Sequence, residues 1–280
     1  MWGARVVITA DALEWALTAA RSMTGFATSI IGCKCEAGIE REWPAEETPD
    51  GRPGVGVLMF TMDAESLGKR LTERIGQCVL TCATTACYNG LDAPDKQDVG
   101  GRLRYFGDGY QISKVLDGRR FWRLPVMEGE FVIEEEFGVQ PAVGGGNLLI
   151  LGRDLPGTLR AAEAAAAAMR QVEGAILPFP GGIVRSGSKI GSRYKAVPAS
   201  TNEAYCPTLR GFVPDSQLPE EAGCVLEIVI DGLTLDAVRE SMRRGLHAAA
   251  EHGALGITAG NYGGNLGQYQ IGLVELLEGT

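Results

Sequence analysis

The chain has 280 residues, 45% of them hydrophobic, and a net charge of −9. Such a chain can bury a substantial core in one large domain or two small ones. The acidic balance disfavours nucleic acids and anionic membranes as partners, because both attract basic surfaces. No apolar run approaches the roughly 20 residues that a membrane span needs. The start, MWGARVVITA, resembles a strand rather than a secretion signal, so we expect a cytoplasmic protein.

Seven cysteines and two histidines are the residues that would suit a metal or a thiol nucleophile. An odd number of cysteines without a secretion signal is typical of free thiols in a reducing compartment. Cys33 and Cys35 form a CxC pair, but zinc sites usually show CxxC pairs or nearby histidines. His247 and His252 are far along the chain. We therefore expect neither a metal site nor a catalytic Cys–His pair.

Hydrophobic periodicity predicts alternating strands and helices in the first half of the chain. Asp11 and Asp63 are the expected helix N-caps, and Cys35–Gly54 is expected to be a polar loop. The predicted elements are a strand over Arg5–Ala10, a helix from Ala12 to Met23, strands over Ala27–Cys33 and Val55–Thr61, a helix from Asp63 towards Thr81, and strands over Arg102–Tyr105, Arg119–Pro125 and Glu130–Phe137.

The second half repeats this order after a break at Gly144–Gly146. Its predicted elements are a strand over Asn147–Gly152, a helix from Pro156 to Val172, a strand over Cys224–Ile230, a helix over Leu235–Glu251, and strands over Leu255–Thr258 and Gln268–Leu273. Each half follows the split βαβ order. We predict an α+β fold of two packed ferredoxin-like lobes, residues 1–143 and 144–280. A doubly wound parallel sheet is the alternative, which the lack of GxGxxG after the first strand weakens.

A long segment, Pro178–Thr208, has neither helical nor strand periodicity. Its apolar residues argue against a linker, so we interpret it as an ordered binding loop. Arg193 and Lys195 add positive charge to it. It contains no GxSxG motif and does not match a P-loop. The candidate binding residues are Ser186, Ser188, Lys189, Thr201 and Asn202.

Two glycine-rich turns, FGDGYQ and AGNYGGNLG, combine an aromatic ring with amides. This chemistry suits a heterocycle with an amide edge, although tight turns with a packed tyrosine would give the same pattern. The candidate binding residues are Asp108, Tyr110, Gln111, Asn261 and Tyr262, together with Arg52 in the ETPDGRPG loop.

Glu227 is the single acidic or basic residue in the strand CVLEIVI, Cys224–Ile230. Both faces of this strand are apolar, so burial would raise the pKa of the carboxyl and suit it to general acid or base catalysis. The alternative is a half-exposed glutamate, or one paired with an arginine.

The same segments resemble the formylmethanofuran:tetrahydromethanopterin formyltransferase family, in its bacterial branch. The matching strings, in family order, are TGFATSII, EAGI, ETPDGRPG, RIGQCVLT, FGDGYQ, LDGRRFW, PVMEGEF, GGGNLLI, PFPGGIVRSGSKIGS, ASTNEAYCPT, EIVIDGL and AGNYGGNLGQY. The resemblance implies two α+β lobes, which we expect to be the proximal lobe at the N-terminus and the distal lobe at the C-terminus.

The family's reaction moves a formyl group between the amine of methanofuran and N5 of tetrahydromethanopterin, without a metal or prosthetic group. The resemblance implies that Glu227 is catalytic and that the anionic tails of the carriers meet Lys189, Arg193 and Lys195. It also implies a homotetramer, or a complex with formylmethanofuran hydrolase subunits. Relatives end in a pattern like IHLHEL, whereas this chain has IGLVELL. A non-catalytic scaffold subunit of such a complex therefore remains the alternative.

Overall fold

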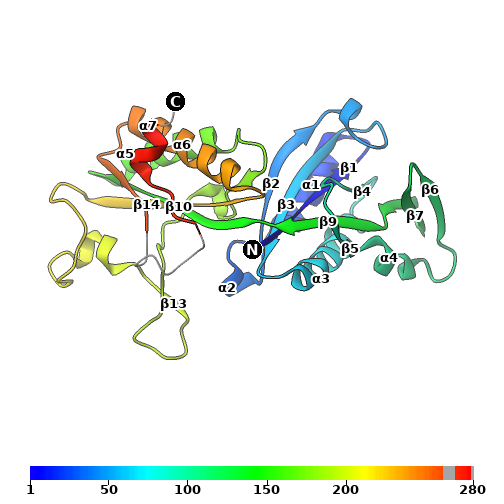
Figure 1. Cartoon of the computed structure of the whole chain (residues 1–280), viewed down its shortest axis with the longest axis horizontal. Helices are drawn as coiled ribbons and strands as arrows, with labels where there is room; N and C mark the ends of the chain where they lie inside the picture. The colour runs from blue at the N-terminus through cyan, green and yellow to red at the C-terminus, as the bar shows by residue number, and fades with distance from the viewer. Residues whose placement is uncertain (261–268, 279–280) are drawn as a thin grey trace. The chain divides into compact units, whose positions relative to one another are not determined.

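The chain folds into two lobes, Met1–Val143 and Gly144–Thr280 (Figure 1). The computed structural model describes residues 1–260 and 269–278. In the described residues, no helix is both long and apolar enough to cross a membrane. Each lobe is built on its own sheet and its own pair of crossover helices.

The first lobe contains a ferredoxin-like sheet with the strand order β2-β3-β1-β4. Helices α1 (Leu13–Thr24) and α3 (Ala64–Arg74) make the two crossovers between its strands. Their buried faces pack on alternate residues of β1 and β3 to form the core. The four strands are β1 (Trp2–Thr9), β2 (Glu36–Trp43), β3 (Gly54–Thr61) and β4 (Ala86–Asn89).

Five further strands extend this sheet. Beyond β4 lie β8, β7 and β6 in that order, while β9 pairs with both β1 and β5. The remaining elements of the lobe are α2 (Ile30–Cys33), β5 (Asp95–Asp98), α4 (Gly100–Leu103), β6 (Ile112–Leu116), β7 (Arg119–Val126), β8 (Gly129–Glu134) and β9 (Glu136–Pro141), with 3-10 turns at Ala45–Glu47 and Arg104–Gly107 and a π-helical turn at Ile75–Val79.

The second lobe has the same topology, with the strand order β11-β14-β10-β15. Helices α5 (Leu155–Met169) and α6 (Leu235–Glu251) contact each other closely, because small residues such as Gly245 let them approach. The strands are β10 (Val143–Gly152), β11 (Ala175–Ile176), β14 (Cys224–Gly232) and β15 (Gly256–Thr258), and α7 (Leu273–Glu278) follows. The predicted fold class, α+β with a split βαβ unit in each lobe, is confirmed.

The predicted binding loop lies in the insertion between β11 and β14. It contains a short hairpin, β12 (Lys189–Ile190) with β13 (Ala199–Ser200), which projects from the rest of the lobe (Figure 1). Three 3-10 turns flank this hairpin, at Pro180–Gly182, Glu203–Tyr205 and Pro207–Leu209. The insertion thus contains short elements separated by irregular chain.

Some local predictions were wrong. Ala27–Cys33 is not a strand, because its second half forms α2, and the strand lies at Glu36–Trp43, where a polar loop was expected. Strand β2 lies at the edge of the sheet, where charged residues are tolerated, and these charged residues made the segment look like a polar loop. Residues 102–105 are helical, and α7 occupies part of the last predicted strand. Asp11 does not cap α1 and binds Arg52 instead.

Candidate functional site

Glu227 lies near the middle of β14 and is 5% exposed. Its neighbour on the same face of the strand, Val225, packs with Leu149 and Leu151 of β10. Tyr205 and Leu218 from the insertion join this cluster. The insertion therefore covers the face of the sheet that carries Glu227.

The insertion is also joined to β14 at Glu227 itself. The Val184 N–H donates to the Glu227 carbonyl at 2.7 Å, and the Glu227 N–H donates to the Val184 carbonyl at 2.9 Å. Val184 is buried. This pair of hydrogen bonds holds the start of the predicted binding loop, with Ser186 and Ser188 just beyond it, beside the candidate catalytic residue.

The environment of the Glu227 carboxyl changes its acidity. Burial raises its pKa from 4.5 to about 7, because the charged form loses hydration. No group in the described part of the chain donates a hydrogen bond to this carboxylate or forms an ion pair with it. The carboxyl is therefore divided between its protonated and ionised forms near neutral pH, which suits a group that gives and takes a proton.

Asn147 of β10 is a buried polar residue that the sequence reasoning missed. It is 8% exposed and binds the Gly260 backbone twice. Its side-chain amide donates to the Gly260 carbonyl at 3.3 Å, and its side-chain oxygen accepts from the Gly260 N–H at 2.7 Å. Asn147 thus holds the residue directly before the candidates Asn261 and Tyr262, which lie outside the described residues. The sequence did carry a signal for this residue, because a polar amide opens the otherwise apolar strand NLLILG.

Of the charged residues in the loop, Lys189 is paired. Its ammonium bonds Glu203, and this hydrogen bond lowers the pKa of the Glu203 carboxyl. Arg193 and Lys195 are exposed near the end of the hairpin and form no ion pair with any described residue. Lys189 therefore fastens the hairpin to the following turn, whereas the other two cations face solvent.

The neutral candidates of the loop differ in exposure. Ser186, Ser188 and Thr201 are exposed, and Asn202 is half-buried. The Thr201 hydroxyl lies 3.3 Å from the thiol of Cys206. The structure thus gathers these candidates and Glu227 within the second lobe.

Arg52 is bound within the first lobe by several groups at once. Its guanidinium donates to Asp50 at 2.9 Å, to Asp11 at 2.9 Å and to the Thr84 carbonyl at 2.5 Å. Tyr88 joins the network by donating to Asp50 at 3.1 Å. These bonds occupy most of the donors of Arg52, and they organise the ETPDGRPG loop.

The FGDGYQ turn is tight and leaves its aromatic ring exposed. Asp108 and Gly109 have positive φ values of 50° and 91°. The side-chain oxygen of Gln111 accepts from the Gly109 N–H at 2.9 Å, while Tyr110 is 79% exposed. Asp108 and Gln111 therefore shape the turn, and Tyr110 is free to contact a ligand.

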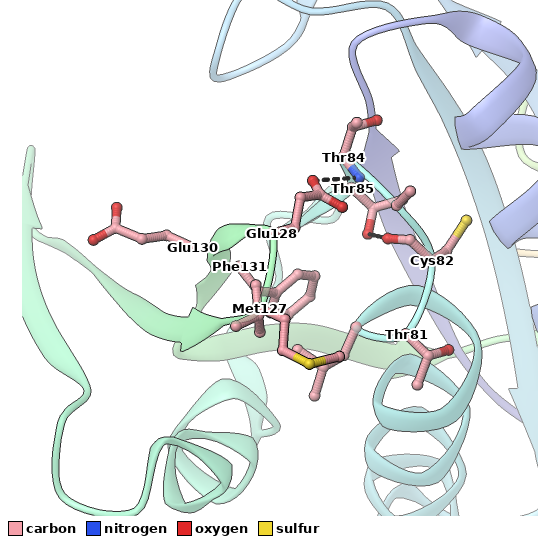
Figure 2. A pocket seen from close by; sticks show the side chains of 11 residues that line it. Thr81, Cys82, Thr84, Thr85, Met127, Glu128, Glu130 and Phe131 are labelled. Atoms are coloured by element: carbon pink, nitrogen blue, oxygen red, sulfur yellow. Dashed lines mark hydrogen bonds between the residues drawn. The ribbon is translucent and has the colours of Figure 1, made fainter.

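A separate cavity of about 230 Å³ lies in the first lobe, between residues 80–85 and the β7–β8 turn. Figure 2 shows Glu128 accepting a hydrogen bond from the Thr84 N–H, at 2.8 Å, on one side of this cavity. Cys82, Met127 and Phe131 contribute its less polar wall. None of the predicted site residues lines it. Within the described ranges, 1–260 and 269–278, no three His, Cys, Asp or Glu side chains group as a metal site would require.

Comparisons with known families agree with this architecture. The family model described as formylmethanofuran-tetrahydromethanopterin formyltransferase matches residues 1–126, and the model described as "FTR, proximal lobe" matches residues 129–276. The chain belongs to this formyltransferase family. The family description thus applies the word proximal to the C-terminal part, the reverse of the names expected for the two lobes.

Relatives of this formyltransferase align with it over nearly its whole length. It is 56% identical to the formylmethanofuran–tetrahydromethanopterin formyltransferase of Methylobacillus flagellatus, over 99% of this chain and 94% of the relative. It is 55% identical to one subunit of the formyltransferase/hydrolase complex of Methylorubrum extorquens, over 99% and 92%. The predicted family is confirmed.

Two solved structures share its fold. The crystal structure of the Methylorubrum extorquens formyltransferase/hydrolase complex with methylofuran matches with a TM-score of 0.95 and 55% identity, over 99% of this chain and 92% of the other. The formyltransferase from Methanosarcina barkeri matches with a TM-score of 0.93 and 47% identity, over 98% and 94%.

Proposed function

We propose that this formyltransferase moves a formyl group between the amine of a methanofuran-type carrier and N5 of tetrahydromethanopterin. Relatives with this activity in their names match the chain over almost its full length. The observation that carries the proposal is the buried Glu227 carboxyl, whose pKa of about 7 places it between its two forms at neutral pH.

The reaction begins when the amine of one carrier attacks the formyl carbon held by the other. A C–N bond forms, and negative charge develops on the formyl oxygen of the tetrahedral intermediate. Protonated Glu227 shares its proton with this oxygen as the charge develops and then delivers the proton to the departing nitrogen, so that the formyl carbonyl can re-form. The proton lost by the attacking amine restores the acid. The old C–N bond then breaks. Holding both carriers in place lowers the remaining barrier.

Each lobe offers its own groups for binding the carriers. Ser186, Ser188, Thr201 and Asn202 are the neutral groups of the loop that we propose contact the carriers. Arg193 and Lys195 attract the anionic tails, because no described carboxylate pairs with them. On the first lobe we propose Asp108, Tyr110 and Gln111 as contacts for a heterocycle, with Arg52 ordering the neighbouring loop. Asn261 and Tyr262 complete the proposed set.

Replacing Glu227 by glutamine tests the proposal directly. Because the amide cannot supply the proton, we expect Glu227→Gln to lower kcat by about 10²–10⁴. The exposed Glu251→Gln on α6 is the matched control and should keep its rate. Steady-state transfer between the two carriers is the measurement, with circular dichroism to check folding. Unchanged transfer by folded Glu227→Gln would reject the catalytic role.

A scaffold subunit is the second candidate function. The observation that favours it is the string IGLVELL, Ile271–Leu277, which lacks the histidines of the pattern IHLHEL and whose residues from Leu273 onward lie in α7. Transfer by the purified wild-type chain alone separates the two functions. A scaffold would show no transfer without its partners, while the enzyme would show it alone.

A further inference from the structure

Phe26 carries an exposed aromatic ring on a strained backbone. Its φ is +50°, in the left-handed region that disfavours residues with a side chain. Phe26 is 80% exposed, so packing of its side chain contributes little to offset the strain. Strained residues persist where surrounding structure holds them, and they occur often at ligand sites.

The backbone on both sides of Phe26 is held firmly. Met23 and Ala27 are fully buried in the core of the first lobe. The guanidinium of Arg74 donates to the carbonyls of Met23, Gly25 and Phe26, the last two at 2.9 and 3.0 Å. The Ala27 carbonyl accepts from the Ala37 N–H of β2 at 2.9 Å. The backbone that carries the ring is therefore held in place by buried neighbours and by Arg74.

The surface near Phe26 suits a small planar ligand better than a protein. Arg21, Ser22 and Gly25 beside it in the chain are exposed and polar or small. A stable protein interface needs about 800 Å² from each partner around an apolar centre. Ile31 of the same TGFATSII string is also exposed, at 58%, but one or two apolar side chains fall far short of that area. A single exposed aromatic ring offers a face for stacking, which a heteroaromatic ring can use.

We infer that Phe26 binds one of the two carriers by stacking on its heteroaromatic ring. The inference rests on the proposed function, because that function supplies ligands that carry such rings, a furan in one carrier and a pterin in the other. It also gives the TGFATSII string, which the catalytic proposal leaves unused, a part in substrate recognition. Phe26 is thus a binding residue for the proposed reaction.

Replacing the ring while keeping its size tests this inference. We expect Phe26→Leu to raise KM for one carrier by about three- to ten-fold, with kcat within about two-fold, because only stacking is lost. Phe26→Tyr should restore binding, and Phe26→Gly should weaken it as well while keeping the melting temperature. Which KM rises, that for methanofuran or that for tetrahydromethanopterin, identifies the ring.

Phe212→Leu is the matched control, since Phe212 is 85% exposed but its φ is not positive. Calorimetry of each carrier with Glu227→Gln, with and without Phe26→Leu, measures binding without turnover and so keeps this test separate from that of catalysis. Equal affinities for both carriers with and without Phe26→Leu would overturn the inference. A fall in native mass with unchanged affinities would also overturn it, by assigning the ring to a second copy of the chain.

Discussion

At the scale of single residues, the acidity of Glu227 follows from where β14 places it. The segment Cys224–Ile230 of this strand is apolar on both faces, so the Glu227 carboxyl loses water whichever face it occupies. The backbone bonds to Val184 add a second segment over it. Burial, with no partner for the carboxylate among the described residues, raises the pKa to about 7, so keeping the group ionised at higher pH has a measurable cost in stability.

The stability of the protein should therefore depend on pH through Glu227. Its folded pKa is about 7 and its ordinary value is 4.5. Because the folded pKa is raised, the free energy of unfolding is unaffected below pH 4.5. It falls as the pH rises through 7, by about 3 kcal/mol at most. Glu227→Gln does not titrate. We expect the unfolding free energy of Glu227→Gln, relative to that of the wild type, to increase between pH 5 and pH 8, as measured by urea titration.

Glu251→Gln is the control for this titration, because its carboxyl is exposed. The unfolding free energy of Glu251→Gln should differ from that of the wild type by the same amount at pH 5 and at pH 8. If Glu227→Gln also kept a constant difference, the carboxyl would have an ordinary pKa in the folded protein, and the argument for a neutral-pH acid would fail.

At the scale of elements, the β12–β13 hairpin separates two kinds of cation. Lys189 at its base is neutralised by Glu203, with side chains 36% and 31% exposed. Arg193 and Lys195 near its end are exposed. A cation without an ion-pair partner attracts an anion over a longer distance than a paired one does. Under the proposed function we therefore expect Arg193 and Lys195, rather than Lys189, to draw the anionic tail.

Removing the two exposed cations should weaken binding in a salt-dependent way. We expect Arg193→Ala with Lys195→Ala to raise KM for the carrier with the anionic tail several-fold in low salt, and less at about 0.5 M salt because ions screen the attraction. Lys189→Met combined with Glu203→Gln removes both charges of the ion pair and should change KM by less than about two-fold. KM at two ionic strengths is the measurement. Equal losses at both salts would show that the two residues do not act through charge.

At the scale of the whole molecule, several surfaces of the single chain expose apolar residues. Strand β6 lies at the end of its sheet, and all five of its residues are exposed. Ile112, Val115 and Leu116 in it are 54%, 51% and 47% exposed. Edge strands with exposed apolar side chains commonly pair with another chain. The fold therefore favours association.

We expect the purified protein to have a native mass of four chains of 29.7 kDa, as native mass spectrometry would measure it. Ile112→Lys with Val115→Lys should lower this mass, because charges on an edge strand oppose pairing. The same pair of changes at Ile190 and Val197 of the projecting hairpin is the control. A single-chain mass for the wild type would contradict the prediction, and added mass from other subunits would indicate the hydrolase complex.

Much of the fold was predictable because local patterns carry it. The ends of β3 and α6 match their predicted positions closely, since buried alternation and helical periodicity are local signals. The burial of Glu227 was predictable for the same reason. Strand β2 was not, because an edge strand such as EAGIEREW resembles a polar loop when its partner β3 is unknown.

The amino-acid sequence by itself determined the family, the repeated split βαβ order and the buried glutamate, because each depends on residues close together in the chain. Only the tertiary structure decided that Val184 pairs with Glu227, that Asn147 holds Gly260, that Glu203 neutralises Lys189 and that Arg74 fixes Phe26. Most of these contacts join residues tens of positions apart, and the chain must fold before such groups meet, so no local pattern records them.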